Sequence, residues 1–180
     1  SYTAGFVFSM LPTTILIFFL EFFNNYNWLR NQIELFSIIQ IIGIIMVVLG
    51  GLFAAFQKSL PRILGYAVMV EIGFSLLALS LNQEIGWLTY IYIMIPRLFA
   101  IAICSFAISI WKNRKLDLEI DKLEGVLQRF PFATSGFLVG WFTFSGIPLL
   151  PGFPTKLPIL IGLSSDSIQA IMYTAFGLIG

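Results

Sequence analysis

The sequence predicts an all-α protein, a polytopic transmembrane helix bundle of about six helices in which one helix is discontinuous. The amino-acid composition supports the prediction of transmembrane helices. The 180 residues are 58% hydrophobic and 11% charged, whereas an ordinary globular domain has about 25% charged residues. The apolar residues also form runs close to the roughly 20 residues that an α-helix needs to cross a bilayer. No strand-like alternation competes with them, so we expect residues 1–180 to form a single transmembrane domain.

Hydropathy divides the chain into five complete spans and one incomplete span. Their expected bounds are residues 4–23, 36–56, 63–81, 86–111, 132–163 and 168–180. The fifth run is too long for one straight span, and Pro148, Pro151, Gly152 and Pro154 fall within it. We therefore expect this helix to break near residues 148–154. The sixth run is shorter than a spanning helix, which indicates a piece of a longer polypeptide.

Basic residues gather in the loops on one side of the predicted bundle. The opposite side holds only Arg30, and the basic side holds Lys58, Arg62, Lys112, Arg114, Lys115, Lys122 and Arg129. Loops rich in lysine and arginine face the cytoplasm, matrix or stroma, so we expect the loop of Lys58 and Arg62 and the N-terminal end of the chain on that side. Residues 112–130 combine charged residues with apolar ones at helical spacing. They predict an amphipathic connection along the membrane surface, with a solvated linker as the alternative.

The residue types exclude several kinds of site. The chain has no histidine and one cysteine, Cys104, so no internal disulfide can form, and zinc, haem and iron–sulfur centres lack their usual ligands. The net charge of +1 gives no reason to expect nucleic acid as a partner. We expect no cofactor in this chain, and a lipid bilayer as its surroundings.

Three ionisable side chains fall well inside predicted spans, at Glu71, Arg97 and Lys156. Charges in hydrocarbon are costly and mark ion pathways or tight pairs. The helical rise places Glu71 roughly 12 Å and Arg97 roughly 21 Å from the same side of the bilayer. An ion pair between these two long side chains is feasible. It would lock two helices together or relay protons; the remaining alternative is that one charge snorkels to water.

Lys156 differs from the other two because its charge coincides with the expected helix break. Half-helix ends leave backbone groups that can face an ion or water, as in many transporters. A buried lysine also exchanges protons near neutral pH more readily than an exposed one. The position of Lys156 therefore predicts either an ion path or a structural tie.

Two stretches of the chain resemble a family of antiporter-like membrane subunits. The first is Gln57-Lys-Ser-Leu-Pro-Arg62-Ile-Leu-Gly-Tyr66 followed by Ile72-Gly73-Phe74, where the family reads Q-x-D-x-K-R-x-L-A-Y-S-S-x-x-x-x-G. The second is G-I-P-L-L-P-G-F-P-T-K, ending at Lys156, which is similar to the family motif G-(I/L)-P-P-x-x-G-F-x-x-K on a discontinuous helix. The family comprises subunits N, M and L of respiratory complex I, mitochondrial subunit 2, photosynthetic NDH subunits and Mrp-type cation/proton antiporters.

The resemblance implies that the chain holds the second of two inverted helical repeats and that Lys156 aligns with the family's terminal lysine. The chain departs from the family pattern elsewhere. Family members generally have a lysine where Pro61 stands, and many have a central lysine near Ala100. Glu71 occupies a position where histidine or glutamine is frequent, and Arg97 is out of register with the central lysine. Lys156 is thus the member of the family's lysine row that this chain keeps.

The primary hypothesis is a membrane subunit that translocates protons, or another cation, in a complex I-like or Mrp-like assembly. Lys156 would exchange the proton, with Glu71 and Arg97 as a rearranged relay. The resemblance implies other membrane subunits as partners, which would carry quinone, NADH, flavin and iron–sulfur centres. It also implies an energy-transducing membrane, namely bacterial cytoplasmic, mitochondrial inner or thylakoid. Two alternatives stay open: a non-conducting structural paralogue, favoured by the missing lysines, and a stand-alone small transporter or channel.

Overall fold

The computed structural model describes residues 2–26, 33–81, 83–123, 125–147 and 150–164. The longer helices in these ranges are α1 (Tyr2–Asn25), α3 (Ile33–Ala55), α4 (Leu60–Ser80), α5 (Gln83–Asn113), α7 (Pro131–Ser145) and α8 (Gly152–Ser164). No β-strand occurs within the described ranges, so the prediction of an all-α fold is confirmed. The predicted sixth span, residues 168–180, lies outside them.

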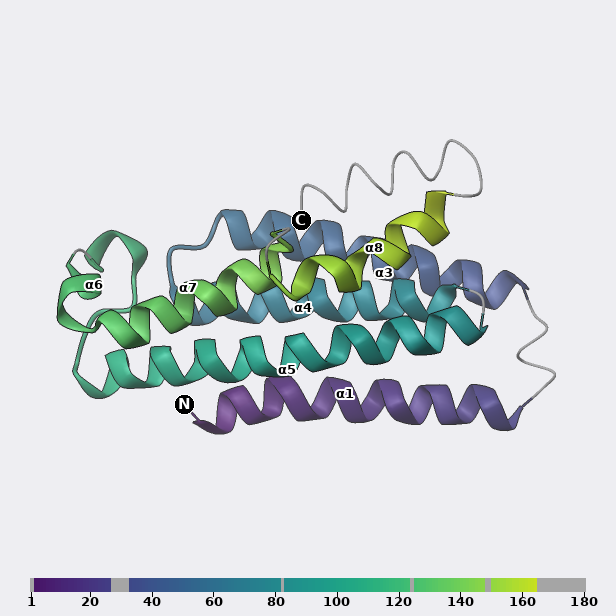
Figure 1. Cartoon of the computed structure of the whole chain (residues 1–180), viewed down its shortest axis with the longest axis horizontal. Helices are drawn as coiled ribbons and strands as arrows, with labels where there is room; N and C mark the ends of the chain where they lie inside the picture. The colour runs from purple at the N-terminus through teal and green to yellow at the C-terminus, as the bar shows by residue number, and fades with distance from the viewer. Residues whose placement is uncertain (1, 27–32, 82, 124, 148–149, 165–180) are drawn as a thin grey trace.

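The long helices lie side by side with nearly parallel axes (Figure 1). Helix α1 packs on α5, α5 on α4 and α4 on α3, while α7 and α8 follow one another across α5. Among the described residues, three segments are long and apolar enough to cross a membrane by length and composition: Glu34–Ala55, Leu60–Ser80 and Leu88–Asn113. Large apolar side chains such as Phe18 and Phe99 point outward, 70% and 66% exposed. An outer surface of this kind suits lipid rather than water, as in a polytopic membrane protein.

The fifth predicted run is divided between two helices, α7 and α8. Helix α7 stops because Gly146 adopts a left-handed conformation (φ 66°), and the N–H of Ile147 then bonds the carbonyl of Phe142. Helix α8 begins at Gly152, where a Cβ atom would overlap the Thr143 carbonyl oxygen, so a larger residue would push the two half-helices apart. Pro154 sits in the first turn of α8, where its missing N–H breaks no helical bond. Of the residues expected at the break, Pro151, Gly152 and Pro154 are described, and Pro148 lies outside the described residues.

Helices α3 and α4 approach closely through small residues. A Cβ atom on Gly73 would lie 2.8 Å from both the carbonyl oxygen of Gly43 and a methyl of Val47. The same atom on Gly65, two turns earlier in α4, would have nothing within 4 Å. Close backbone contact at glycine is the packing mode that membrane helices favour, because lipid supplies no hydrophobic drive for association.

We expect Gly73→Leu to destabilise the fold by about 1–3 kcal/mol, the usual cost of overpacking a well-packed contact. Gly65→Leu makes the same change on the same helix without displacing a neighbour, so it should leave the thermal midpoint nearly unchanged. Thermal unfolding of the two purified variants in detergent compares them directly. Equal midpoints would contradict the close α3–α4 contact.

The connection between α5 and α7 folds back on the loop between α3 and α4. The N–H of Leu60 donates to the Leu118 carbonyl at 3.0 Å, and the N–H of Ile120 donates to the Lys58 carbonyl at 2.9 Å. A short 3₁₀ turn (Ile120–Lys122) and α6 (Val126–Arg129) are the helical pieces described in this connection. No continuous amphipathic helix therefore forms in the described part of residues 112–130, because its backbone groups pair with the neighbouring loop instead.

Exposed ion pairs form within this connection and between it and the α3–α4 loop. Lys122 Nζ lies 2.7 Å from Asp117 and 2.9 Å from Glu119, and Lys58 Nζ lies 3.1 Å from Asp121. The hydrogen bond from Lys122 lowers the pKa of Asp117 below its ordinary value of 3.8. A carboxyl with a lowered pKa contributes stability that is present above its ordinary pKa and is lost as the pH falls through the folded-state pKa.

The titration of Asp117 checks this arrangement. We expect the carboxyl to titrate below 3.8 in the folded protein, and Lys122→Ala to return its midpoint towards that value. Carboxyl chemical shifts followed against pH by NMR measure both midpoints. An unchanged midpoint in Lys122→Ala would show that the contact is not maintained in solution.

Candidate functional site

The three charged residues predicted inside spans gather at the middle of the bundle. Glu71 and Arg97 are 4% and 3% exposed, and the Lys156 side chain is 12% exposed. Two buried hydrophobic clusters flank them along α4 and α5: one contains Val68 and Ala100, the other Val70 and Ile93. The charges therefore occupy the seam between two apolar regions.

Lys156 forms a buried ion pair with Glu71. Its Nζ lies 2.9 Å from Glu71 Oε1, donates to the carbonyl of Phe144 at 2.7 Å and sits 4.5 Å from the centre of the Phe74 ring. The Phe144 carbonyl belongs to the last turn of α7, where carbonyl groups have no helical partner. The helix break thus supplies an acceptor for the lysine, and the negative end of the α7 dipole favours its charge.

Arg97 ties three helices together through hydroxyl groups. Its Nη1 donates to Ser75 Oγ on α4 at 2.8 Å, and its Nη2 donates to Thr13 Oγ1 on α1 at 2.9 Å. Between the two described residues Glu71 and Arg97 no ion pair forms, so the pairing considered from the sequence is replaced by Glu71 with Lys156. The reason is that α8 packs against α4, which brings the Lys156 ammonium group into contact with the Glu71 carboxylate.

Glu71, Arg97 and Lys156 nevertheless share one space. A cavity of about 10 Å³ is lined by these three residues together with Thr143 and Thr155, besides apolar neighbours. That volume is close to the least that holds one water molecule. The structure thus brings together all three charges that the sequence placed inside spans.

Other residues named from the sequence lie away from this site. Lys58 pairs with Asp121 on the exposed connection, and Arg62 lies in the first turn of α4. Two partners of Arg97, Thr13 and Ser75, were not foreseen. A serine or threonine in a span does not by itself predict a contact with another helix, because its hydroxyl can donate to a carbonyl of its own helix. Ser75 does so by donating to the Glu71 carbonyl.

Comparisons with known proteins identify the family of this chain. Residues 3–179 match the family described as NADH:quinone oxidoreductase/Mrp antiporter, transmembrane. The chain belongs to this family of membrane proteins, which confirms the resemblance seen in the sequence motifs.

Similar proteins include quinone oxidoreductase subunits from several organisms. The chain is 28% identical over 138 residues to NAD(P)H-quinone oxidoreductase chain 4 of a Synechococcus strain, covering 77% of this chain and 26% of that protein. It is 25% identical over 145 residues to NADH-ubiquinone oxidoreductase chain 5 of Balaenoptera physalus, covering 81% and 24%. It is 30% identical over 129 residues to NADH-quinone oxidoreductase subunit N of Francisella tularensis, covering 71% and 27%. The chain thus spans about a quarter of the length of these relatives.

Proposed function

We propose that this chain is the proton-exchanging part of an ion-translocating membrane subunit. The observation that carries the proposal is the buried Lys156–Glu71 pair, with a nitrogen–oxygen distance of 2.9 Å, at the gap between α7 and α8. Ionisable residues inside membrane spans are rare and mark ion paths. Broken helices with exposed backbone groups accompany them in transporters.

The chemistry is a reversible proton exchange. While Glu71 is ionised, it holds the Lys156 ammonium group in place. When a proton neutralises Glu71, the attraction is lost and Lys156 can release its own proton towards the gap. Arg97 supplies a fixed positive charge beside the same small cavity.

The wider setting follows from the family. We propose that the intact protein works with other membrane subunits of a complex I-like or Mrp-like assembly, in an energy-transducing membrane. Electron transfer, quinone and the redox cofactors would belong to partner subunits. The loop of Lys58 and Arg62 would face the cytoplasm, matrix or stroma, in accordance with the distribution of basic residues.

A second candidate function is a structural subunit that does not conduct. Arg97 favours it, because its hydrogen bonds to α1 and α4 make it a tie between helices. A satisfied Lys156–Glu71 pair would act in the same way. The two functions differ in whether the lysine must lose its proton.

The variant Lys156→Arg distinguishes the proton-exchanging function from the structural one. Arginine keeps the positive charge and can still pair with Glu71, but it does not deprotonate in proteins. In the full-length protein within its assembled complex, in sealed vesicles, we expect the variant to fold and to lose proton translocation. Native translocation by Lys156→Arg would overturn the proposed function and leave the structural one.

A further inference from the structure

An apolar cavity lies between α5 and α7, on the outer surface of the bundle. It has a volume of about 270 Å³, and its lining includes Phe99 and Ile103 of α5 and Val139 of α7. These three side chains are 66%, 39% and 49% exposed, so the cavity opens outward rather than into the core. The cavity therefore meets whatever surrounds this face of the bundle.

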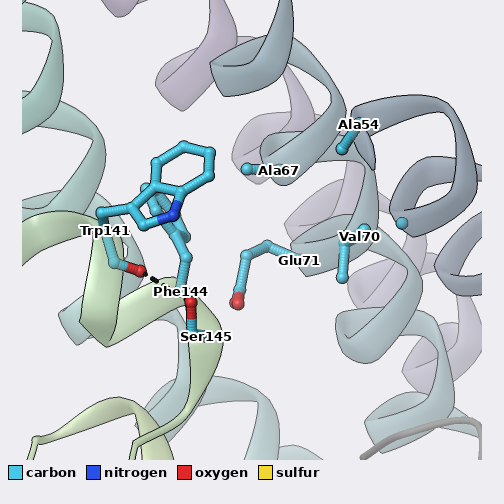
Figure 2. A pocket seen from close by; sticks show the side chains of 8 residues that line it. Ala54, Ala67, Val70, Glu71, Trp141, Phe144 and Ser145 are labelled. Carbon is cyan, nitrogen blue, oxygen red and sulfur yellow. Dashed lines mark hydrogen bonds between the residues drawn. The ribbon is translucent and has the colours of Figure 1, made fainter. Parts of the chain in front are cut away.

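The chemistry of the lining favours hydrocarbon over water as the occupant. Among the described residues that line the cavity none is charged, and its one hydroxyl, that of Thr143, already donates to the Val139 carbonyl at 2.8 Å. The pocket in Figure 2, on another face of α7, differs because the Glu71 carboxylate projects into it. An apolar cavity of about 150 Å³ stays dry and binds benzene. A volume of about 270 Å³ then takes a hydrocarbon stretch of roughly ten carbons.

The cavity is too shallow for a helix of another protein. Helices α5 and α7 touch at its floor, where a Cβ atom on Gly140 would lie 2.7 Å from Cys104 Sγ. An α-helix with its side chains is about 10–12 Å wide. A single extended hydrocarbon chain fits between the two helices, whereas a helix does not.

Exposed basic side chains surround the end of the bundle where α5 ends and α7 begins (Figure 1). They are Lys112, Arg114, Lys115 and Arg129. None of the four forms an ion pair within the described part of the chain. The described acidic side chains of the same connection are already paired with Lys122 and Lys58. The end of the α5–α7 cleft thus carries uncompensated positive charge, which attracts an anionic group.

The spacing between the basic end and the cavity matches one leaflet of a bilayer. The helical rise places Ile103 roughly 14 Å from Lys112 along α5, and half of the hydrocarbon core of a bilayer is about 15 Å thick. Phe106 of α5 and Phe132 at the start of α7 are 55% and 92% exposed, so apolar surface continues from the cavity towards the basic end. A lipid whose head group lies at Lys112 has its chain end at the depth of the cavity.

We propose that the α5–α7 cavity and the basic end together bind one anionic phospholipid. The phosphate lies against Lys112, Arg114 and Arg129, and one acyl chain follows the cleft between α5 and α7 into the cavity beside Phe99. Loops rich in lysine and arginine would face the cytoplasm, matrix or stroma, and the cytoplasmic leaflet is rich in anionic lipids. The site does not include the Lys156–Glu71 pair and does not depend on the proposed function.

A photoreactive lipid tests the site. The full-length protein is placed in phosphatidylcholine nanodiscs with a trace of phosphatidylglycerol that carries a diazirine at the end of one acyl chain. We expect the label, located by peptide mass spectrometry, on the α5 segment 95–103 that lines the cavity. A phosphatidylcholine probe with the same diazirine should label this segment far less. Equal labelling by both probes, or no labelling of the segment, overturns the proposal.

The head-group half of the site is tested by charge removal. Arg114→Gln with Arg129→Gln should weaken labelling by phosphatidylglycerol roughly 30-fold, because each basic residue near the membrane surface adds to the attraction. Lys58→Gln with Arg62→Gln is the matched control, since it removes the same charge from the α3–α4 loop at the same end of the bundle. It should weaken labelling clearly less. Equal losses in the two variants overturn the site, because net charge alone would then attract the lipid.

The acyl-chain half is tested by filling the cavity. Val139→Trp places an indole in the cavity and should lower labelling of the α5 segment at least roughly tenfold, since burial of a few methylene groups is lost. Leu138→Trp is the matched control, because Leu138 is the neighbouring residue, is 39% exposed and does not line the cavity. Both changes are at exposed positions, so both variants should keep the thermal midpoint. Native labelling of folded Val139→Trp overturns the proposal, whatever Lys156→Arg does to translocation.

Discussion

Lys156→Met is expected to lower the free energy of unfolding by about 3–5 kcal/mol and to stop proton translocation. Removing one partner of a buried ion pair leaves the other charge without compensation, which accounts for a loss of this size. Here the stranded group would be Glu71, whose side chain is 5% exposed. Chemical unfolding of the purified protein in mild detergent measures the stability, and pH-sensitive dye in sealed vesicles measures translocation.

Lys58→Met is the matched control for this prediction. Lys58 also forms a lysine–carboxylate pair, but its side chain and that of Asp121 are 77% and 65% exposed. Exposed pairs contribute about 0–1 kcal/mol, since water already solvates both charges. If Lys156→Met cost no more than Lys58→Met, the buried pair would not contribute to the fold as described.

The double variant Glu71→Leu with Lys156→Met is expected to regain most of the stability that Lys156→Met loses. Replacing both members of a buried ion pair by apolar side chains of similar size is often neutral or stabilising by about 1–4 kcal/mol. The free energies of unfolding of wild type, both single variants and the double variant form a cycle that isolates the interaction. Purely additive losses would contradict direct contact between the two side chains.

This double variant also separates stability from transport. A structural tie can be replaced by any contact that holds α4 and α8 together. A proton carrier cannot, because leucine and methionine have no group that binds a proton. The double variant should therefore fold but not translocate protons.

Much of the fold followed from the sequence, since hydropathy alone located the long helices. The break followed from Gly152 and the prolines around it, because their backbone chemistry acts locally. The placement of Lys156 at the break followed for the same reason.

The partners of the charges could not be predicted in the same way. Glu71 faces Lys156 rather than Arg97 because α8 crosses near α4, an arrangement that depends on contacts far apart in the chain. The contact of Arg97 with Thr13 likewise requires α1 to lie against α5. Neither arrangement leaves a periodic pattern in the sequence.

The structure of the connection over residues 112–130 could not be predicted from its amphipathic pattern. Apolar residues at helical spacing indicated an amphipathic surface segment, and a continuous helix would satisfy that pattern. The backbone of Leu118 and Ile120 instead bonds that of Leu60 and Lys58. Hydrogen bonds between distant loops override local helical preference, and side-chain spacing does not report them.

Proton translocation by the Glu71→Leu, Lys156→Met double variant, assembled in its full-length complex in sealed vesicles, shows whether the Lys156–Glu71 pair exchanges protons. We expect no translocation above that of protein-free vesicles, at a normal amount of folded complex. Translocation at the native rate would show that the Lys156–Glu71 pair is a structural tie, and would contradict its assignment as the proton-exchanging unit.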